Sequence, residues 1–343
     1  MLTCCRADST SRGAPLVLSR SHVPADTSRP VLATTVGGVL REAAEQLPDG
    51  VGLVSPGLGA GSRREWTFGE LLEASEAVAR ALLGRFAAGE HVAVWAPNLP
   101  EWILLRLGMG LAGLVLVPLD PACRQSDLGY ALRQSKAVGL FYVPEFRGSP
   151  MAEWVAALRD ELPNLREAIS LDEWDRFRVS GSPQQNLPEV SPSDPAQIQY
   201  TSGTTGAPKG AVLHHRGITN NGRFVVDSFG VEPGEAYLNP APLFHVAGSV
   251  VGVLGALACR ARLVQPVVFE PSAGTCPRCG SWESVAQPFP PISYARSRPD
   301  WASSSVCSSD RRRRPARSRR RGLATRPRKK PRPSGDRCRR PKA

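Results

Sequence analysis

Thr201-Ser-Gly-Thr-Thr-Gly-Ala-Pro-Lys-Gly210 is the stretch of this 343-residue chain that decides its fold and its chemistry. It concentrates hydroxyl side chains, glycines and one lysine in a short segment. Glycine lets the backbone approach a ligand closely, clustered N–H groups and hydroxyls bind phosphate oxygens, and lysine adds a positive charge. The spacing differs from that of a Walker loop, in which the lysine directly follows a glycine. The stretch therefore predicts a loop that binds the phosphates of a nucleotide, rather than a plain surface turn.

The residues on either side of this loop predict two strands that hold it. Residues 196–200, Ala-Gln-Ile-Gln-Tyr, alternate apolar and polar side chains, as a half-buried strand does. Residues 211–213, Ala-Val-Leu, form a second short extended segment. We expect the loop to be fixed at both ends by these strands.

Predicted helices and strands alternate along the chain before the loop. Apolar residues between Leu71 and Leu83 recur at helical spacing and predict an amphipathic helix. Residues 89–95 predict a turn into a buried strand, residues 96–102 a loop entering a helix, residues 115–119 another strand, and residues 127–134 a helix. Such alternation predicts parallel strand pairing and an α/β layered fold.

The loop closely resembles the phosphate-binding motif of the adenylate-forming superfamily, which includes acyl-CoA synthetases, luciferases and the adenylation domains of peptide synthetases. The resemblance covers about residues 30–271 and implies an incomplete N-terminal domain built from layered parallel-sheet subdomains. It also implies that the loop binds the β- and γ-phosphates of ATP while an acyl-adenylate forms. The residues carried over by position are Thr201, Ser202, Gly203, Thr204, Thr205, Gly206 and Lys209.

A second motif, Asn239-Pro-Ala-Pro-Leu-Phe-His-Val-Ala-Gly-Ser249, resembles the acyl-CoA synthetase branch of this superfamily. In that branch an aromatic–His pair lies beside the acyl pocket, which assigns Phe244 and His245 to the pocket here. Adenylation domains of peptide synthetases usually lack this pair, so the motif favours a carboxylic acid substrate over an amino acid. An isolated histidine would more simply be a loop residue with satisfied hydrogen bonds. The position of this one, about 40 residues after the phosphate loop, supports the pocket interpretation.

Residues 102–119 contain a single charge, Arg106, and several glycines, which allows a membrane helix as an alternative. Pro118, the position of Arg106 near one end and the family resemblance favour a buried helix that runs into a buried strand. Residues 1–30 lack the apolar segment of a secretory signal. Cys123 and Cys259 stand apart, without a disulfide framework. We therefore expect no membrane span and a cytoplasmic location.

The composition of the chain changes abruptly near residue 271. Residues 1–271 contain 34 Leu, whereas residues 272–343 contain one. Residues 311–343 hold 14 Arg and 3 Lys against one acid, a charge of +16 in a chain whose net charge is +12. The basic character belongs to the tail, and the rest of the chain is slightly acidic. Because the tail has few aliphatic residues, it cannot bury enough apolar surface to offset its chain entropy, and we expect it to be disordered.

Three hypotheses account for this tail. It could bind nucleic acid or act as a localisation signal, as Arg/Lys runs do. Cys276 and Cys279 could be half of a zinc site, but only Cys307 and Cys338 follow, singly, so we expect no metal site. It could also be an out-of-frame translation, which the sudden end of the resemblance favours. The expected organisation is then a disordered or non-native extension over residues 1–29, a partial AMP-binding, acyl-CoA synthetase-like domain over residues 30–271, and a low-complexity, Arg/Pro/Ser-rich tail over residues 272–343, which we expect to be frameshifted.

The remaining motifs of the superfamily should follow residue 271, and none is present. They are a Tyr-Gly-x-Thr-Glu segment, an Asp for the ribose, a hinge, and a catalytic Lys in a small C-terminal domain. Lys342 lacks that context, so no catalytic residue is assigned.

The functional hypothesis is a fragment of an ATP-dependent acyl-CoA synthetase, inactive as given because the downstream motifs are missing. The intact relative would join a carboxylic acid, a small molecule, to ATP and then to CoA, with Mg²⁺ bridging the phosphates. The alternative is a basic-tailed nucleic-acid-binding protein whose body is a scaffold. Salt-dependent binding to any DNA, lost on deletion of residues 311–343, would distinguish the two. The first hypothesis involves no specific nucleic acid.

Overall fold

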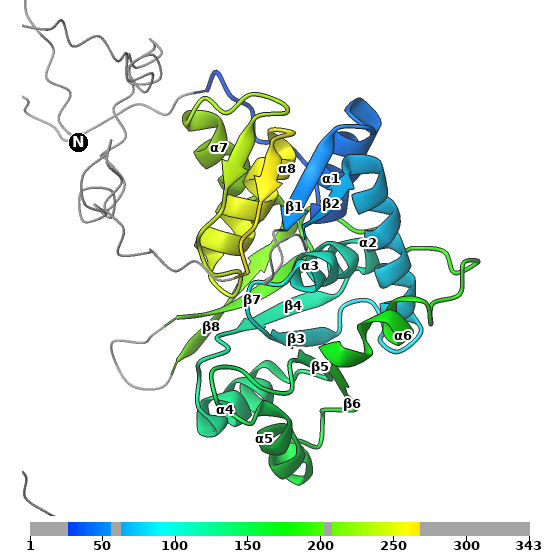
Figure 1. The fold of residues 1–343 in the computed structure, drawn as a ribbon, viewed down its shortest axis with the longest axis vertical. Helices are drawn as coiled ribbons and strands as arrows, with labels where there is room; N and C mark the ends of the chain where they lie inside the picture. The colour runs from blue at the N-terminus through cyan, green and yellow to red at the C-terminus, as the bar shows by residue number, and fades with distance from the viewer. Residues whose placement is uncertain (1–26, 56–62, 202–207, 268–343) are drawn as a thin grey trace, which may run out of the picture. The chain divides into compact units, whose positions relative to one another are not determined.

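The computed structural model describes residues 27–55, 63–201 and 208–267. These residues form two β-sheets with helices packed around them (Figure 1). The larger sheet has the strand order β6-β5-β3-β4-β7-β8, with β3 His91–Trp95, β4 Val115–Leu119, β5 Gly139–Tyr142, β6 Glu167–Ser170, β7 Pro195–Thr201 and β8 Lys209–His214. The smaller sheet has the order β2-β1-β10-β9, with β1 Val51–Ser55, β2 Arg64–Thr67, β9 Ala236–Leu238 and β10 Arg262–Val264.

Parallel pairing dominates both sheets, as the alternation of helices and strands predicts. Only β1–β2 and β7–β8 pair antiparallel among the described strands. The predicted strands over residues 91–95 and 115–119 are β3 and β4, and the two strands that flank the loop are β7 and β8. The α/β layered fold is therefore confirmed.

Helices cover both faces of the larger sheet (Figure 1). Successive strand side chains point to opposite faces. Val92 and Val94 of β3 accordingly join the core formed with α1 Val36–Gln46, α2 Phe68–Leu83 and α3 Pro100–Ala112. Trp95 joins a second core with α4 Gln125–Ser135 and α5 Met151–Leu158. The remaining helical segments are η1 Arg159–Glu161, η2 Leu171–Glu173, α6 Trp174–Arg178, α7 His215–Ser228, the π-helix η3 Ala247–Leu254 and α8 Gly255–Ala258.

The predicted amphipathic helix is α2, and its start has a clear local cause. Thr67 accepts a hydrogen bond from the Glu70 backbone N–H at 3.1 Å, and the Glu70 carboxylate accepts one from the Thr67 N–H at 2.9 Å. This capping box satisfies two backbone donors that a helix start leaves free. Leu71, Val78 and Leu82 then face the core, as their spacing predicts.

The apolar segment over residues 102–119 is a buried helix followed by a buried strand, as predicted. Gly113 ends α3 in the left-handed conformation at φ 68°, which glycine adopts without strain. The chain then enters β4, all of whose residues are buried. No helix within residues 27–55, 63–201 and 208–267 is long and apolar enough to cross a membrane.

The prediction of a half-buried strand over residues 196–200 is right about the strand and wrong about its burial. Both faces of β7 are covered, and Gln197 and Gln199 are 0% and 8% exposed. Polar residues tolerate such burial when their amides are hydrogen-bonded. Here Arg106 of α3 donates to Gln197, which in turn donates to Gln199.

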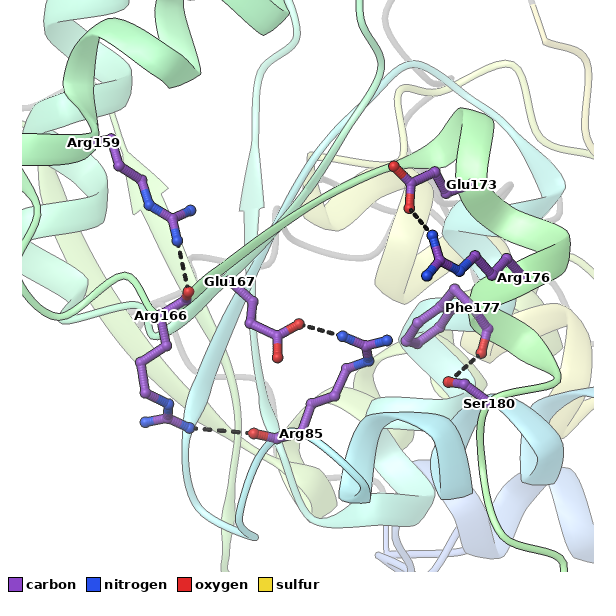
Figure 2. A network of polar contacts seen from close by, with 8 residues as sticks. All are labelled: Arg85, Arg159, Arg166, Glu167, Glu173, Arg176, Phe177 and Ser180. Carbon is purple, nitrogen blue, oxygen red and sulfur yellow. Dashed lines mark hydrogen bonds and ion pairs between the residues drawn. The ribbon is translucent and has the colours of Figure 1, made fainter.

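A polar network gathers near the amino end of β6 (Figure 2). Arg85, which follows α2, forms an ion pair with Glu167 at 2.5 Å, and Arg166 donates to the Arg85 carbonyl. Arg166 also pairs with Glu90 just before β3, and this hydrogen bond is the main cause of the lowered pKa of the Glu90 carboxyl. Exposed pairs of this kind contribute little to stability. The network joins the amino ends of two parallel strands, opposite the edge where the phosphate loop begins.

Candidate functional site

The segment predicted to bind phosphate connects two neighbouring strands of the larger sheet. β7 ends at Thr201 and β8 begins at Lys209, and these two residues are partners in the strand register, with exposed side chains. The structure therefore brings together the two ends of the predicted site. The other predicted phosphate ligands, Ser202, Gly203, Thr204, Thr205 and Gly206, lie outside the described residues.

Two tyrosines tie the stems of the loop to α4. The Tyr200 hydroxyl donates to the Ala131 carbonyl at 3.0 Å and also bonds to Gln134. The Tyr130 hydroxyl donates to the Pro208 carbonyl at 2.9 Å. Burial raises the pKa of Tyr200, so this hydroxyl keeps its proton and remains a donor at neutral pH. One helix thus fixes the chain on both sides of the loop.

Phe244 and His245 form a turn between β9 and the π-helix. The His245 carbonyl accepts hydrogen bonds from the backbone N–H groups of Gly248 and Ser249 at 3.0 and 2.9 Å. The His245 Nδ1 accepts from the Ala247 N–H at 3.1 Å. When Nδ1 is an acceptor, the proton of a neutral imidazole resides on Nε2. The exposed His245 ring therefore offers an Nε2–H donor.

Two side chains, one from a strand of the larger sheet and one from the loop after β3, hold this turn. Asn98, which follows β3, accepts from the Leu243 N–H at 2.8 Å and donates to the Ala241 carbonyl at 3.2 Å. Gln199 of β7 donates to the Phe244 carbonyl at 3.3 Å. Gln199 lies two residues before Thr201, so the second motif rests against the strand that leads into the phosphate loop. Both predicted parts of the site lie at the carboxyl edge of the parallel strands, where open α/β sheets bind ligands.

A buried pair of amide side chains supports the turn that contains Phe244 and His245. Asn239 donates to the Gln265 side-chain oxygen at 2.7 Å and to the Gly248 carbonyl at 3.1 Å, while Gln265 donates back to the Asn239 carbonyl. Their exposed fractions are 2% and 0%. Sequence reasoning did not single out Asn98, Gln199, Asn239 or Gln265 individually. The signal available for Asn239 is its place at the start of the second motif.

The described part of the chain contains no group of three or more His, Cys, Asp or Glu placed to hold a metal ion. The cysteines considered for zinc, Cys276, Cys279, Cys307 and Cys338, lie outside it. Cys123 and Cys259 are both free thiols. Burial raises their pKa values to about 12 and 11, which makes each a poor thiolate nucleophile at neutral pH.

The helix after the turn packs closely against α7 through glycines. A Cβ on Gly222 would lie 2.5 Å from the Val250 carbonyl oxygen and 2.9 Å from the Gly255 nitrogen. Backbone atoms cannot move aside as a flexible side chain does. We expect Gly222→Ala to lower the free energy of unfolding by about 1–3 kcal/mol, measured by urea denaturation. Gly84→Ala is the matched control, because a Cβ there meets nothing closer than 3.5 Å. Equal stability of the two variants would contradict this packing.

Comparison with known proteins gives a consistent result. The family model described as AMP-binding enzyme matches residues 40–276. The chain is 30% identical over 276 residues to the medium-chain acyl-CoA ligase ACSF2, mitochondrial, of Mus musculus, covering 71% of this chain and 44% of that protein. It is 26% identical over 269 residues to the putative acyl-CoA synthetase YngI of Bacillus subtilis (strain 168), covering 70% and 48%. The chain therefore spans slightly less than half the length of these relatives.

Solved structures agree with this match. The inhibitor-bound N-terminal domain of FACL13 from Mycobacterium tuberculosis superposes with a TM-score of 0.60 at 25% identity, covering 70% of this chain and 58% of that one. A long-chain-fatty-acid-CoA ligase, FadD1, from Archaeoglobus fulgidus gives a TM-score of 0.63 at 22% identity, covering 71% and 49%, and supports the fold alone. The family match, the sequence relatives and the shared fold lead to one conclusion: the chain belongs to the AMP-binding enzyme family.

Proposed function

We propose that this chain is the N-terminal part of an ATP-dependent acyl-CoA ligase. The observation that carries the proposal is the hydrogen bond from Gln199 to the Phe244 carbonyl. It seats the Phe–His turn against the strand that ends at the phosphate loop, so a carboxylate beside the turn would lie near the phosphates of ATP. The names of the relatives, acyl-CoA ligases and synthetases, support the same chemistry.

The proposed reaction has two steps. A carboxylate oxygen attacks the α-phosphorus of ATP and pyrophosphate leaves; the thiol of CoA then attacks the acyl carbon and AMP leaves. Lys209 and Thr201 would hold the β- and γ-phosphates, and Phe244 and His245 would line the acyl group. Mg²⁺, when bound, would offset phosphate charge. Because Mg²⁺ commonly takes its ligands from substrate phosphates and water, a set of three protein ligands is not required.

We further propose that residues 272–343 do not belong to this enzyme and that the chain is inactive as given. The support is the compositional change near Pro271 and the absence of the later superfamily motifs from the sequence. We propose a cytoplasmic location on the strength of the free Cys123 and Cys259 thiols, which suit a reducing compartment. The ACSF2 relative is mitochondrial, so this location needs a direct test by cell fractionation.

The +16 charge of residues 311–343 supports a second candidate, a nucleic-acid-binding protein. Binding of the chain to random-sequence DNA, measured from low to high salt, separates the two. If DNA binding has a steep salt dependence and is lost on deletion of residues 311–343, while no acid is ever activated, the second candidate stands.

The test of the ligase proposal uses the gene read in the other two frames after codon 271. A chain completed in the frame that encodes a Tyr-Gly-x-Thr-Glu segment should make acyl-CoA from ATP, CoA and a carboxylic acid. A panel of acids of increasing chain length then identifies the substrate. Stop codons or unrelated sequence in both frames would remove the frameshift hypothesis, and a well-folded completed chain that activates no acid would remove the ligase proposal.

His245→Asn in the completed enzyme should change which acids are used. The Asn oxygen can still accept from the Ala247 N–H, so the turn keeps its cap, but the Nε2–H donor is lost. We expect kcat/KM for the best acid to fall by about 10-fold, the effect of one hydrogen bond, with a changed order of preference among acids. The KM for ATP should change far less. His214→Asn, at the exposed start of α7, is the control, and an unchanged acid profile in His245→Asn would contradict the pocket assignment.

A further inference from the structure

A buried chain of hydrogen bonds runs from α3 to the Phe–His turn. Arg106 Nη1 donates to Gln197 Oε1 at 2.7 Å. Gln197 Nε2 donates to Gln199 Oε1 at 2.7 Å, and Gln199 Nε2 donates to the Phe244 carbonyl at 3.3 Å. All three side chains are buried, with exposed fractions of 2%, 0% and 8%. This hydrogen-bond chain crosses the core and ends at the proposed acyl pocket.

Both ends of this hydrogen-bond chain favour one direction, because Arg106 only donates and the Phe244 and Tyr200 carbonyls only accept. A guanidinium group has only N–H donors, whereas a glutamine amide has an oxygen on one side and N–H groups on the other. Gln197 must therefore turn its oxygen toward Arg106 and its N–H groups toward Gln199. Gln199 must then present its oxygen to Gln197, which leaves its N–H groups for the carbonyls of Phe244 and Tyr200.

Arg106 is an unusual residue for this position if its role is only to fill space. Burial lowers the pKa of its guanidinium to about 9, and no ion pair with a carboxylate of the described residues offsets this effect. Its Nε and Nη2 atoms have no hydrogen-bond acceptor within the described residues. A buried charge without a counter-ion is strongly unfavourable, and an apolar side chain of similar length would avoid it. A role beyond packing explains why a cation stands here.

We propose that Arg106 is a positioning residue that fixes the direction of this hydrogen-bond chain and thereby the peptide that joins Phe244 to His245. That peptide positions the start of the π-helix, because the His245 carbonyl and Nδ1 accept hydrogen bonds from the first backbone N–H groups of the π-helix. The consequence for acid binding rests on the proposed function, in which Phe244 and His245 line the acyl pocket. The effect on the turn itself does not depend on any ligand.

Gln197→Glu tests the direction. The carboxylate gives Arg106 a counter-ion, so the variant should melt roughly 2–4 °C higher. A carboxylate can only accept, so Gln199 must turn its N–H groups toward residue 197 and its oxygen toward the Phe244 carbonyl. The turn then loses its donor. Amide hydrogen exchange at residues 247–249 should become on the order of 5- to 10-fold faster in the unliganded chain. If residue 197 only stabilised the core, a higher melting temperature would be accompanied by slower exchange, not faster exchange.

Two further variants keep the test decisive even if Gln197→Glu fails to fold. Arg106→Lys retains a donor for Gln197, so exchange at residues 247–249 should stay within about 2-fold of the natural chain. Arg106→Met removes the donor and leaves Gln197 Oε1 unpaired, so it should also accelerate this exchange, by less than Gln197→Glu because the Phe244 and Tyr200 carbonyls still favour the original direction. Unchanged exchange in Gln197→Glu or Arg106→Met, or equal acceleration with Lys and Met, would overturn the proposal. These measurements need neither ATP nor an acid, so the ligase proposal could fail without affecting them.

Discussion

The purified 343-residue chain should neither form acyl-CoA nor exchange pyrophosphate into ATP with any carboxylic acid, whereas the completed chain should do both. The described residues supply the two ends of the predicted phosphate loop and a Phe–His turn, but the sequence lacks the later motifs of the superfamily. Correct alignment of reactants alone can supply about 7–11 kcal/mol of a barrier, and it requires the groups that hold the nucleotide in place. Radiolabelled pyrophosphate exchange at saturating ATP measures the difference.

Within the completed chain, Lys209→Ala should reduce the exchange rate by about 100- to 1,000-fold, because a charge that stabilises the departing phosphates is lost. Lys209 is exposed at the start of β8, so its removal should leave stability unchanged. Arg41→Ala, at an exposed position on α1, is the matched loss of a positive charge and should retain full activity. Exchange by the 343-residue chain would disprove the missing-motif explanation, and full activity of Lys209→Ala would disprove the loop assignment.

The second large effect is a loss of stability in mild acid, caused by His215. This residue begins α7, is 0% exposed, and accepts a hydrogen bond from the Val36 N–H through Nδ1 at 3.2 Å. Burial and the nearby charge of Arg106 lower the pKa of the imidazole to about 4. The unfolded chain, with an ordinary pKa of about 6.5, therefore binds a proton that the folded chain does not. The free energy of unfolding should fall by about 3 kcal/mol between pH 6.5 and pH 4.

Urea denaturation at a series of pH values measures this loss. His215→Asn keeps an acceptor for the Val36 N–H but does not titrate, so it should remove this part of the pH dependence. His214 is the exposed neighbour that caps α7, and His214→Asn should leave the pH dependence of the free energy of unfolding unchanged. If the natural chain and His215→Asn lose stability in parallel from pH 6.5 to 4, the buried neutral histidine is not responsible.

Much of the fold could be predicted from periodicity. The spacing of Leu71, Val78 and Leu82 predicts α2, and the buried segment from Trp102 to Leu119 predicts α3 and β4, because apolar side chains must face a core. The burial of β7 could not be predicted in this way. Gln197 and Gln199 alternate with apolar residues as solvent-facing residues would. Their burial depends on hydrogen bonds with Arg106 and Phe244, which are distant in sequence.

The candidate site, like the fold, has parts that could be predicted from the sequence and parts that could not. Thr201 and Lys209 were predicted from the composition of one segment, and the strands on either side place them together. The proximity of Phe244 to β7 depends on Asn98 and Gln199, whose contacts span more than 40 residues of sequence and leave no local pattern. The family resemblance identified the motif, and the contacts that seat it required the structure.

The pairing of β1 with β10 has a consequence for synthesis on the ribosome. Leu53 of β1 is fully buried in a parallel ladder opposite Leu263, whereas the strands of the larger sheet are all made by His214. At 5–20 residues per second, β1 waits roughly 10–40 s for its partner strand after it has been translated. During that interval one edge of β1 is an open template for other nascent chains. The smaller sheet should therefore be the part of the molecule that most needs a chaperone, and slower translation over residues 55–262 should increase misassembly rather than relieve it.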